Sequence, residues 1–190
     1  MKCYSKIILA AAILFSATVP GYSQRTIAGS SFVEVCGSVP VPFSVPLNGI
    51  GASVLFGRYT TDGLWSVGVR GDNRVMLSPL DNEYDVSRVC ASAERVWRIV
   101  ASWNRRYNIY GGAGVQLGAE IIDPRGMLSS EEVITGRRAP FVYSCDAVLC
   151  AEAFIFPNVS FTMAVRPFLT GGSRYGIFFA TASAGLRFSF

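Results

Sequence analysis

The chain has 190 residues, a formal net charge of +4 and no histidine, and 51% of its residues are hydrophobic while only 16% are charged. The charged share lies well below the roughly one quarter found in soluble domains, and the absence of histidine excludes Ser-His and Cys-His nucleophile pairs. The basic residues are spread along the chain without a block that could follow a nucleic-acid backbone, so we expect no direct contact with nucleic acid.

The first 23 residues have the pattern of a secretory signal. Lys2 and Lys6 precede the short apolar run Ile7–Phe15, and the small residues Gly21 and Ser23 lie just before the expected cut. The run is shorter than the roughly 20 apolar residues that a membrane helix needs. We therefore predict a cleaved signal peptide at 1–23 and a single exported domain at 24–190, with a retained amphipathic helix as the alternative.

From Ser30 onward, apolar and polar residues alternate between turn signals, which is typical of β-strands. We predict eight strands, at Ser30–Gly37, Gly49–Tyr59, Leu64–Gly71, Tyr84–Ala101, Tyr107–Ile122, Pro140–Phe156, Val159–Leu169 and Tyr175–Phe190. Long polar loops are expected at Asp72–Glu83 and Asp123–Arg138, and short turns around Asn104 and Pro157. Short turns at one end and longer loops at the other are expected of membrane barrels, although a further short turn around Thr61 makes this alternation imperfect.

The alternation indicates which surface each strand presents. The last strand places on one face Phe178, Ala180, Ala182, Ala184, Leu186, Phe188 and Phe190, and small or polar residues on the other. No segment after residue 23 offers the 18 or more apolar residues of a membrane helix. The sequence therefore predicts an all-β fold, an eight-stranded antiparallel transmembrane β-barrel with a polar, side-chain-filled interior. A soluble β-sandwich with its apolar face turned inward is the competing fold.

The closing segment Leu186-Arg187-Phe188-Ser189-Phe190 is similar to the signal by which outer-membrane barrels are recognised for assembly. Phe188 and Phe190 would carry that signal. We accordingly expect the barrel-assembly machinery and outer-membrane lipid to be partners of the exported chain.

Several charged residues fall on the polar faces, and in a barrel they would meet in the lumen. They are Glu34, Arg70, Glu94, Glu120, Asp146, Glu152, Arg166 and Arg187. Buried charges persist only when they are paired and hydrogen-bonded. We predict a structural ion-pair network that fills the lumen and leaves no open channel, with a proton or substrate site built from several carboxylates as the alternative.

Arg95 and the cysteines test the assignment of faces. Strict alternation places Arg95 on the lipid face, where a mid-membrane arginine costs roughly 2–4 kcal/mol. Either a bulge or a position near the membrane interface must reduce this cost, or the predicted register is wrong there. Cys145 should face lipid and Cys150 the lumen, which argues against a bond between them. Four cysteines, at 36, 90, 145 and 150, allow three pairings among which the sequence does not choose.

With no histidine and no paired CxxC spacing, we expect no structural zinc site, no cofactor and no catalytic residue. Aromatic residues near strand ends would form interfacial girdles, with core packing as the alternative. They are Trp65, Tyr84, Trp97, Tyr107 and Tyr143.

Several stretches, taken in order, resemble the TraO family of conjugative-transposon transfer proteins. They are Ser23-Gln24-Arg25, Leu64–Val69, Glu94, Ile109–Glu120, Ala151-Glu152-Ala153, Arg166 and Gly185–Phe188. The chain departs from the family pattern at Arg70-Gly71, where Glu-Tyr is usual, and the family's Arg-Glu-Arg around Arg166 is incomplete. The resemblance implies a non-enzymatic outer-membrane component of a conjugative transfer apparatus that acts through contacts with other apparatus proteins. A stand-alone structural or adhesion barrel and a barrel enzyme acting on lipid or envelope substrates are the alternatives.

Overall fold

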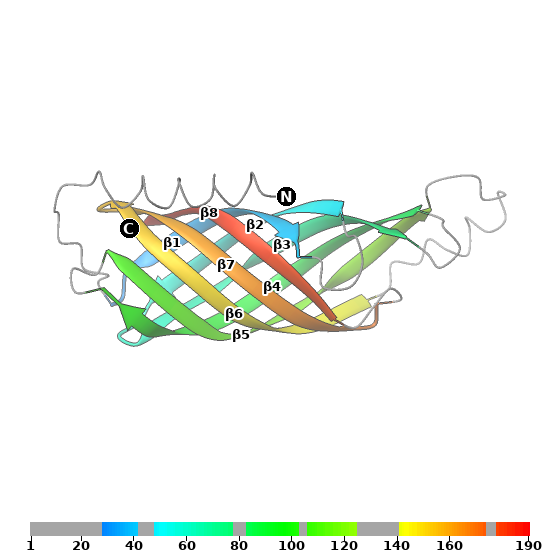
Figure 1. The fold of residues 1–190 in the computed structure, drawn as a ribbon. Helices are drawn as coiled ribbons and strands as arrows, with labels where there is room; N and C mark the ends of the chain where they lie inside the picture. Colours follow the sequence, from blue (N-terminus) through cyan, green and yellow to red (C-terminus); the bar gives the residue numbers. More distant parts are fainter. Residues whose placement is uncertain (1–27, 42–47, 78–82, 103–105, 125–140, 174–177) are drawn as a thin grey trace.

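The computed structural model describes residues 28–41, 48–77, 83–102, 106–124, 141–173 and 178–190. The predicted signal peptide and most of the predicted long loops lie outside these residues. The described chain forms eight strands that follow one another around a cylinder (Figure 1): β1 Ser31–Pro40, β2 Asn48–Tyr59, β3 Gly63–Leu77, β4 Glu83–Ala101, β5 Tyr107–Pro124, β6 Phe141–Phe156, β7 Val159–Gly171 and β8 Phe178–Ser189.

The strands form a closed antiparallel barrel. Each strand pairs with the next in sequence, and β8 pairs with β1 across a seam in which Glu34 lies opposite Arg187. Closure leaves no unpaired strand edge that another chain could extend. The predicted eight-stranded barrel is confirmed, and the sandwich is not formed. Within the described residues, no helix is long and apolar enough to cross a bilayer.

The two ends of the barrel differ in the length of their connections. The turns after β2, β4 and β6 lie at one end, which we call the short-turn end, and the connections after β1, β3, β5 and β7 lie at the other, the long-loop end. Residues 60–62 therefore share an end with the other short turns. The expected imperfection in the alternation remains, because the connections at 78–82 and 102–106, which lie at opposite ends, are equal in length.

The barrel wall is apolar outside and polar inside. Val115 and Leu117 on β5 are 55% and 53% exposed on the outer surface, while Gln116 between them points into the lumen and is 3% exposed. The same period of two holds along β6, where exposed and buried residues alternate from Phe141 to Glu152. Ala180 on β8, expected outside, is buried instead, at a point where the N–H of Val41, just beyond β1, donates to its carbonyl.

Strand β3 extends further than predicted. The segment from Asp72, expected to begin a loop, continues the ladder to Leu77, with Asp72 opposite Arg88 and Arg74 opposite Val86 on β4. The prediction of a loop was wrong because the polar side chains of Asp72 and Arg74 face the lumen and not solvent. In this barrel a polar residue that faces the lumen is compatible with a strand.

Arg95 keeps the predicted outward orientation and lies close to the short-turn end. Its guanidinium donates to Asp62 at 2.9 Å and to Thr60 at 3.1 Å, both in the turn after β2. The ladder runs without interruption through Arg95, and the register shifts only between Arg98 and Val100. Of the explanations considered from the sequence, its position at the end of the barrel is therefore the one that applies.

The described cysteines are all free thiols, with Cys145 on the outer surface and Cys36, Cys90 and Cys150 buried in the lumen. The predicted opposite orientation of Cys145 and Cys150 is confirmed. In the part of the chain that the structure describes, no three cysteine or carboxylate side chains lie close enough to hold a metal ion.

Candidate functional site

Arg187 on β8 is the centre of one group of buried charges. Its Nη2 donates to Glu34 Oε2 on β1 at 2.5 Å, and its Nη1 donates to Glu152 Oε1 on β6 at 2.9 Å. One guanidinium thus joins the two seam strands to β6, which is separated from β8 by β7. We call these three residues and their hydrogen-bond partners the Arg187 network.

Several donors complete the coordination of Glu152. Tyr59 donates its hydroxyl to Oε1 at 2.5 Å, Ser160 does so at 2.8 Å, and Tyr110 donates to Oε2 at 2.8 Å. A carboxylate with this many donors can stay ionised in a dry interior. The Arg187 network therefore satisfies the condition under which buried charge is tolerated.

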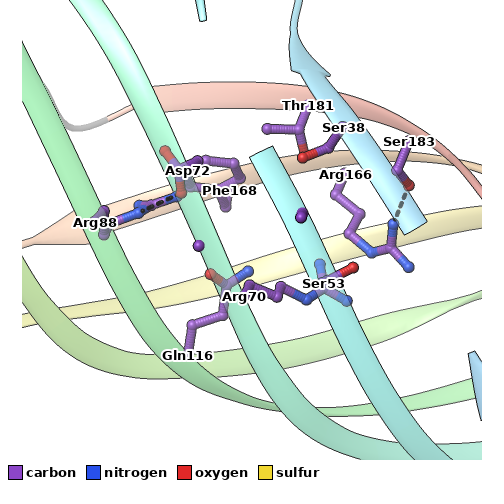
Figure 2. A pocket seen from close by; sticks show the side chains of 12 residues that line it. Ser38, Ser53, Arg70, Asp72, Arg88, Gln116, Arg166, Phe168, Thr181 and Ser183 are labelled. Carbon is purple, nitrogen blue, oxygen red and sulfur yellow. Dashed lines mark hydrogen bonds and ion pairs between the residues drawn. The ribbon is translucent and has the colours of Figure 1, made fainter. Parts of the chain in front are cut away.

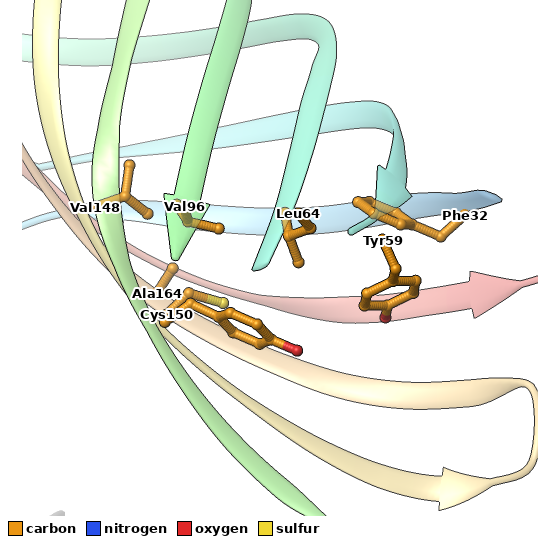
Figure 3. Close-up of a cluster of buried hydrophobic side chains, with 8 residues drawn as sticks. Phe32, Tyr59, Leu64, Val96, Val148, Cys150 and Ala164 are labelled. Atoms are coloured by element: carbon orange, nitrogen blue, oxygen red, sulfur yellow. The ribbon is translucent and has the colours of Figure 1, made fainter. Parts of the chain in front are cut away.

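Apolar side chains surround this network toward the short-turn end. Figure 3 shows the cluster, formed by Phe32, Tyr59, Leu64, Val96, Tyr110, Val148, Cys150 and Ala164. The guanidinium of Arg187 lies 4.5 Å from the ring centroid of Phe32, so its face is covered by an aromatic group. This end of the lumen is filled by packed side chains.

Glu94 on β4 organises a second group, which we call the Glu94 network. Its Oε1 accepts from Arg166 Nε on β7 at 3.0 Å and forms a close ion pair with Arg70 on β3. Arg166 also donates to Ser183 at 2.6 Å, and Arg70 donates to Ser92 at 3.2 Å. One carboxylate here serves two guanidinium groups, the inverse of the ratio around Arg187.

Asp146 and Glu120, predicted members of the lumen network, are buried in the lumen but stand apart from the described ion pairs. Asp146 accepts from the Gln116 amide at 3.4 Å, and Glu120 accepts from the Ser173 hydroxyl at 3.3 Å. The structure thus brings all eight predicted residues into the lumen and joins six of them in two separate networks.

A third group, which the sequence analysis missed, lies toward the long-loop end. Asp72 accepts from Arg88 at 3.1 Å and pairs with Arg74 at 2.5 Å. Both guanidinium groups lie over the ring of Phe168, at 4.6 Å and 5.2 Å. Arg88 lies on the same face of β4 as Glu94, so the period of two along that strand could have identified it. Asp72 and Arg74 were missed because they lie in the segment predicted as a loop.

A cavity of about 30 Å³ lies between the Glu94 network and this third group (Figure 2). Its wall includes Arg70, Asp72, Arg88 and Arg166, and a smaller space of about 10 Å³ lies beside Arg74 and Glu120. A single water needs roughly 10–15 Å³ of such volume. The larger space therefore has room for about two water molecules and the smaller for at most one, which is far from the dimensions of a solute channel.

The described lumen offers one thiol beside a carboxylate. Cys36 Sγ donates to Glu34 Oε1 at 2.9 Å, but both groups are nearly fully buried and Glu34 is held by Arg187. A nucleophile needs a place beside it for a substrate, and the cavity lies elsewhere, toward Arg70 and Arg88. The contacts favour a structural role for the pair.

No family model matches the chain, and no curated protein matches it. Among solved structures, the chain is similar to the outer membrane protein OprG from Pseudomonas aeruginosa, with a TM-score of 0.56 and 14% identity over 90% of this chain and 99% of that one. It is also similar to Neisserial surface protein A, with a TM-score of 0.53 and 15% identity over 85% of this chain and 96% of that one. At these identities the likeness shows the fold that the three chains share.

Proposed function

We propose that this chain is a non-enzymatic outer-membrane β-barrel of a bacterial conjugative transfer apparatus, and that it acts through protein–protein contacts. The observation that carries the membrane part is the division of the wall: large apolar side chains outside, ion pairs inside. An apolar belt around a whole domain would drive aggregation in water, whereas in a bilayer it meets hydrocarbon.

The ends of the barrel support an orientation in the membrane. Outer-membrane barrels have short periplasmic turns and longer external loops, so the short-turn end would face the periplasm. Trp65, Trp97 and Tyr107 are exposed on the outer surface near that end, as an interfacial girdle requires. Phe188 and Phe190 are also exposed there, where the assembly machinery could read them.

The residues that resemble the TraO family support the conjugative part of the proposal indirectly. Glu94, Glu152, Arg166 and Arg187 all belong to the lumen networks, so the resemblance concerns residues that hold the barrel together. Contacts with apparatus proteins would then be made by the turns and loops, which are free to differ between members.

Two experiments test the proposal in sequence. Envelope fractionation and heat-modifiable mobility should place a folded barrel in the outer membrane, and recovery of soluble periplasmic protein would contradict the membrane assignment. Deletion of the gene should then abolish transfer of the conjugative element, with restoration by the wild-type gene as the control. Unchanged transfer would remove the conjugative role and leave a stand-alone structural or adhesion barrel.

The enzyme alternative is tested by Glu120→Gln and Glu152→Gln. Because both carboxylates are buried and hydrogen-bonded, we expect these variants to lower the stability of the barrel and not to block one specific functional step. Normal heat-modifiable mobility together with a lost envelope-modifying activity would favour an enzyme.

A further inference from the structure

The cavity in Figure 2 has a wall that is rich in hydrogen-bond donors. Arg70 comes from β3, Arg88 from β4 and Arg166 from β7, so guanidinium groups approach it from two sides of the barrel. Asp72 is the one carboxylate on its lining, and it is already engaged by Arg74 and Arg88. The cavity is thus lined by guanidinium donors, by hydroxyls that can donate or accept, and by the amide of Gln116, whose Nε2 donates to Asp146 and whose oxygen is an acceptor.

Unused donors can be assigned to individual atoms. Arg70 bonds through Nε and Nη2, and Arg166 through Nε and Nη1. Among the described residues, Arg70 Nη1, Arg166 Nη2 and both terminal nitrogens of Arg88 have no hydrogen-bond partner. The hydroxyls of Ser38, Ser53 and Thr181 line the same space and likewise have no described partner.

Such a wall suits a guest that only accepts hydrogen bonds. The unpaired guanidinium N–H groups can only donate, and a halide ion accepts from several donors at once, whereas a water molecule accepts at most two hydrogen bonds. The ion pairs beside the cavity set four guanidinium groups against the carboxylates of Asp72 and Glu94. Asp146 also acts electrostatically on Arg70 and Arg166, and Glu120 on Arg74.

We propose that this cavity binds a small monovalent inorganic anion of the size of chloride. About 30 Å³ has room for one such ion. Held between Arg70, Arg88 and Arg166, the anion joins β3 and β4 to β7 across the lumen. It therefore stabilises the half of the barrel that the Arg187 network does not reach.

The direct test is a crystal of the purified barrel grown with bromide in place of chloride. An anomalous peak within hydrogen-bond distance of Arg70 and Arg166 is expected. Density that refines as water with no anomalous signal would overturn the proposal. In solution, the unfolding temperature should rise with chloride and saturate, relative to gluconate at the same ionic strength; equal temperatures in the two salts would contradict it.

Variants separate a bound ion from general salt effects. Ser53→Leu fills the cavity without removing a charge and should abolish the difference between chloride and gluconate. Arg58→Gln is the matched control, since Arg58 is exposed at the short-turn end, and it should keep the wild-type difference.

Should Ser53→Leu fail to assemble, Thr181→Val removes one donor with little change of shape. It should raise the chloride concentration at half effect by about tenfold, as the loss of a hydrogen bond to an ion predicts. A halide response in either variant equal to that of the wild type would overturn the site.

Discussion

The Arg187 network and the Glu94 network are built from the same chemical groups inside one barrel, yet their surroundings differ. Around Arg187, two carboxylates share one guanidinium, hydroxyl donors complete the coordination, and aromatic and aliphatic side chains cover the group. Around Glu94, two guanidinium groups share one carboxylate and border a cavity. One network is sealed, and the other has space for a guest.

This difference indicates how each half should respond to damage. In a sealed site, no water or ion can replace the lost partner of a buried charge, so the free energy of unfolding falls by a large amount. Beside a cavity, water or an ion can take the vacant position, so the loss is smaller. Substitutions of comparable chemistry in the two halves should therefore have unequal effects.

The largest effect is expected from Arg187→Ala. It leaves Glu34 and Glu152 buried without their cation, which should lower the free energy of unfolding by about 3–5 kcal/mol. Urea titration in detergent, followed by heat-modifiable mobility, measures the change. Combining Arg187→Met with Glu34→Gln and Glu152→Gln should recover most of the loss; a loss below about 1 kcal/mol for Arg187→Ala would show that the site is not sealed.

Glu94→Gln is the matching change in the other half. It leaves Arg70 and Arg166 without their shared carboxylate, but the adjoining cavity admits a substitute partner. We expect a loss of about 1–3 kcal/mol in the same titration. A loss as large as that of Arg187→Ala would break the distinction between the two networks.

Smaller losses of unfolding free energy are expected when a single hydroxyl is removed from each network. Tyr110→Phe removes one donor to Glu152 and should cost about 1–2 kcal/mol, because Tyr59, Ser160 and Arg187 still bind that carboxylate. Ser92→Ala removes a partner of Arg70 near the cavity and should cost about half as much. The reverse order, measured by unfolding of both variants under one condition, would count against a sealed Arg187 network.

The smallest effect is expected at the exposed pair of Arg95 and Asp62, which serves as the solvated reference. The Thr60 hydroxyl, the backbone of the turn and Arg95 lower the pKa of the Asp62 carboxyl below its usual 3.8. The ionised carboxylate therefore stabilises the fold at pH values above 3.8. This stabilisation is lost as the pH falls from 3.8 through the lower pKa of the folded state. Asp62→Asn should therefore differ slightly from wild type near neutral pH and converge with it in acid, as followed by unfolding temperature; divergence in acid would contradict the assignment.

Much of the fold could be predicted because a barrel wall has one simple rule. The period of two placed Gln116, Arg187 and Glu152 in the lumen, and Val115 and Phe188 outside it, without knowledge of any contact. Alternation depends only on the local backbone. For that reason faces were predicted more accurately than boundaries.

The contacts themselves could not be predicted, because they depend on register and on how far strands extend. Asp72 and Arg74 resembled loop residues until the ladder carried them to positions opposite Arg88 and Val86. The separation of Glu120 from the ion pairs, and the cavity beside Arg70, depend on which side chains meet across the lumen. A single sequence contains no direct signal for such contacts between distant side chains.

The central claim is that the apolar face of each strand meets hydrocarbon while the charged face is enclosed. Its most direct test places one spin label in turn at 115, 116 and 117 of β5, in a chain whose own cysteines are replaced by alanine and which is reconstituted in bilayers. Labels at 115 and 117 should collide freely with lipid-soluble oxygen and poorly with a water-soluble nickel chelate, while the label at 116 should be shielded from both. Equal accessibility at the three positions, or free access of the nickel chelate at 115 and 117, would contradict the account.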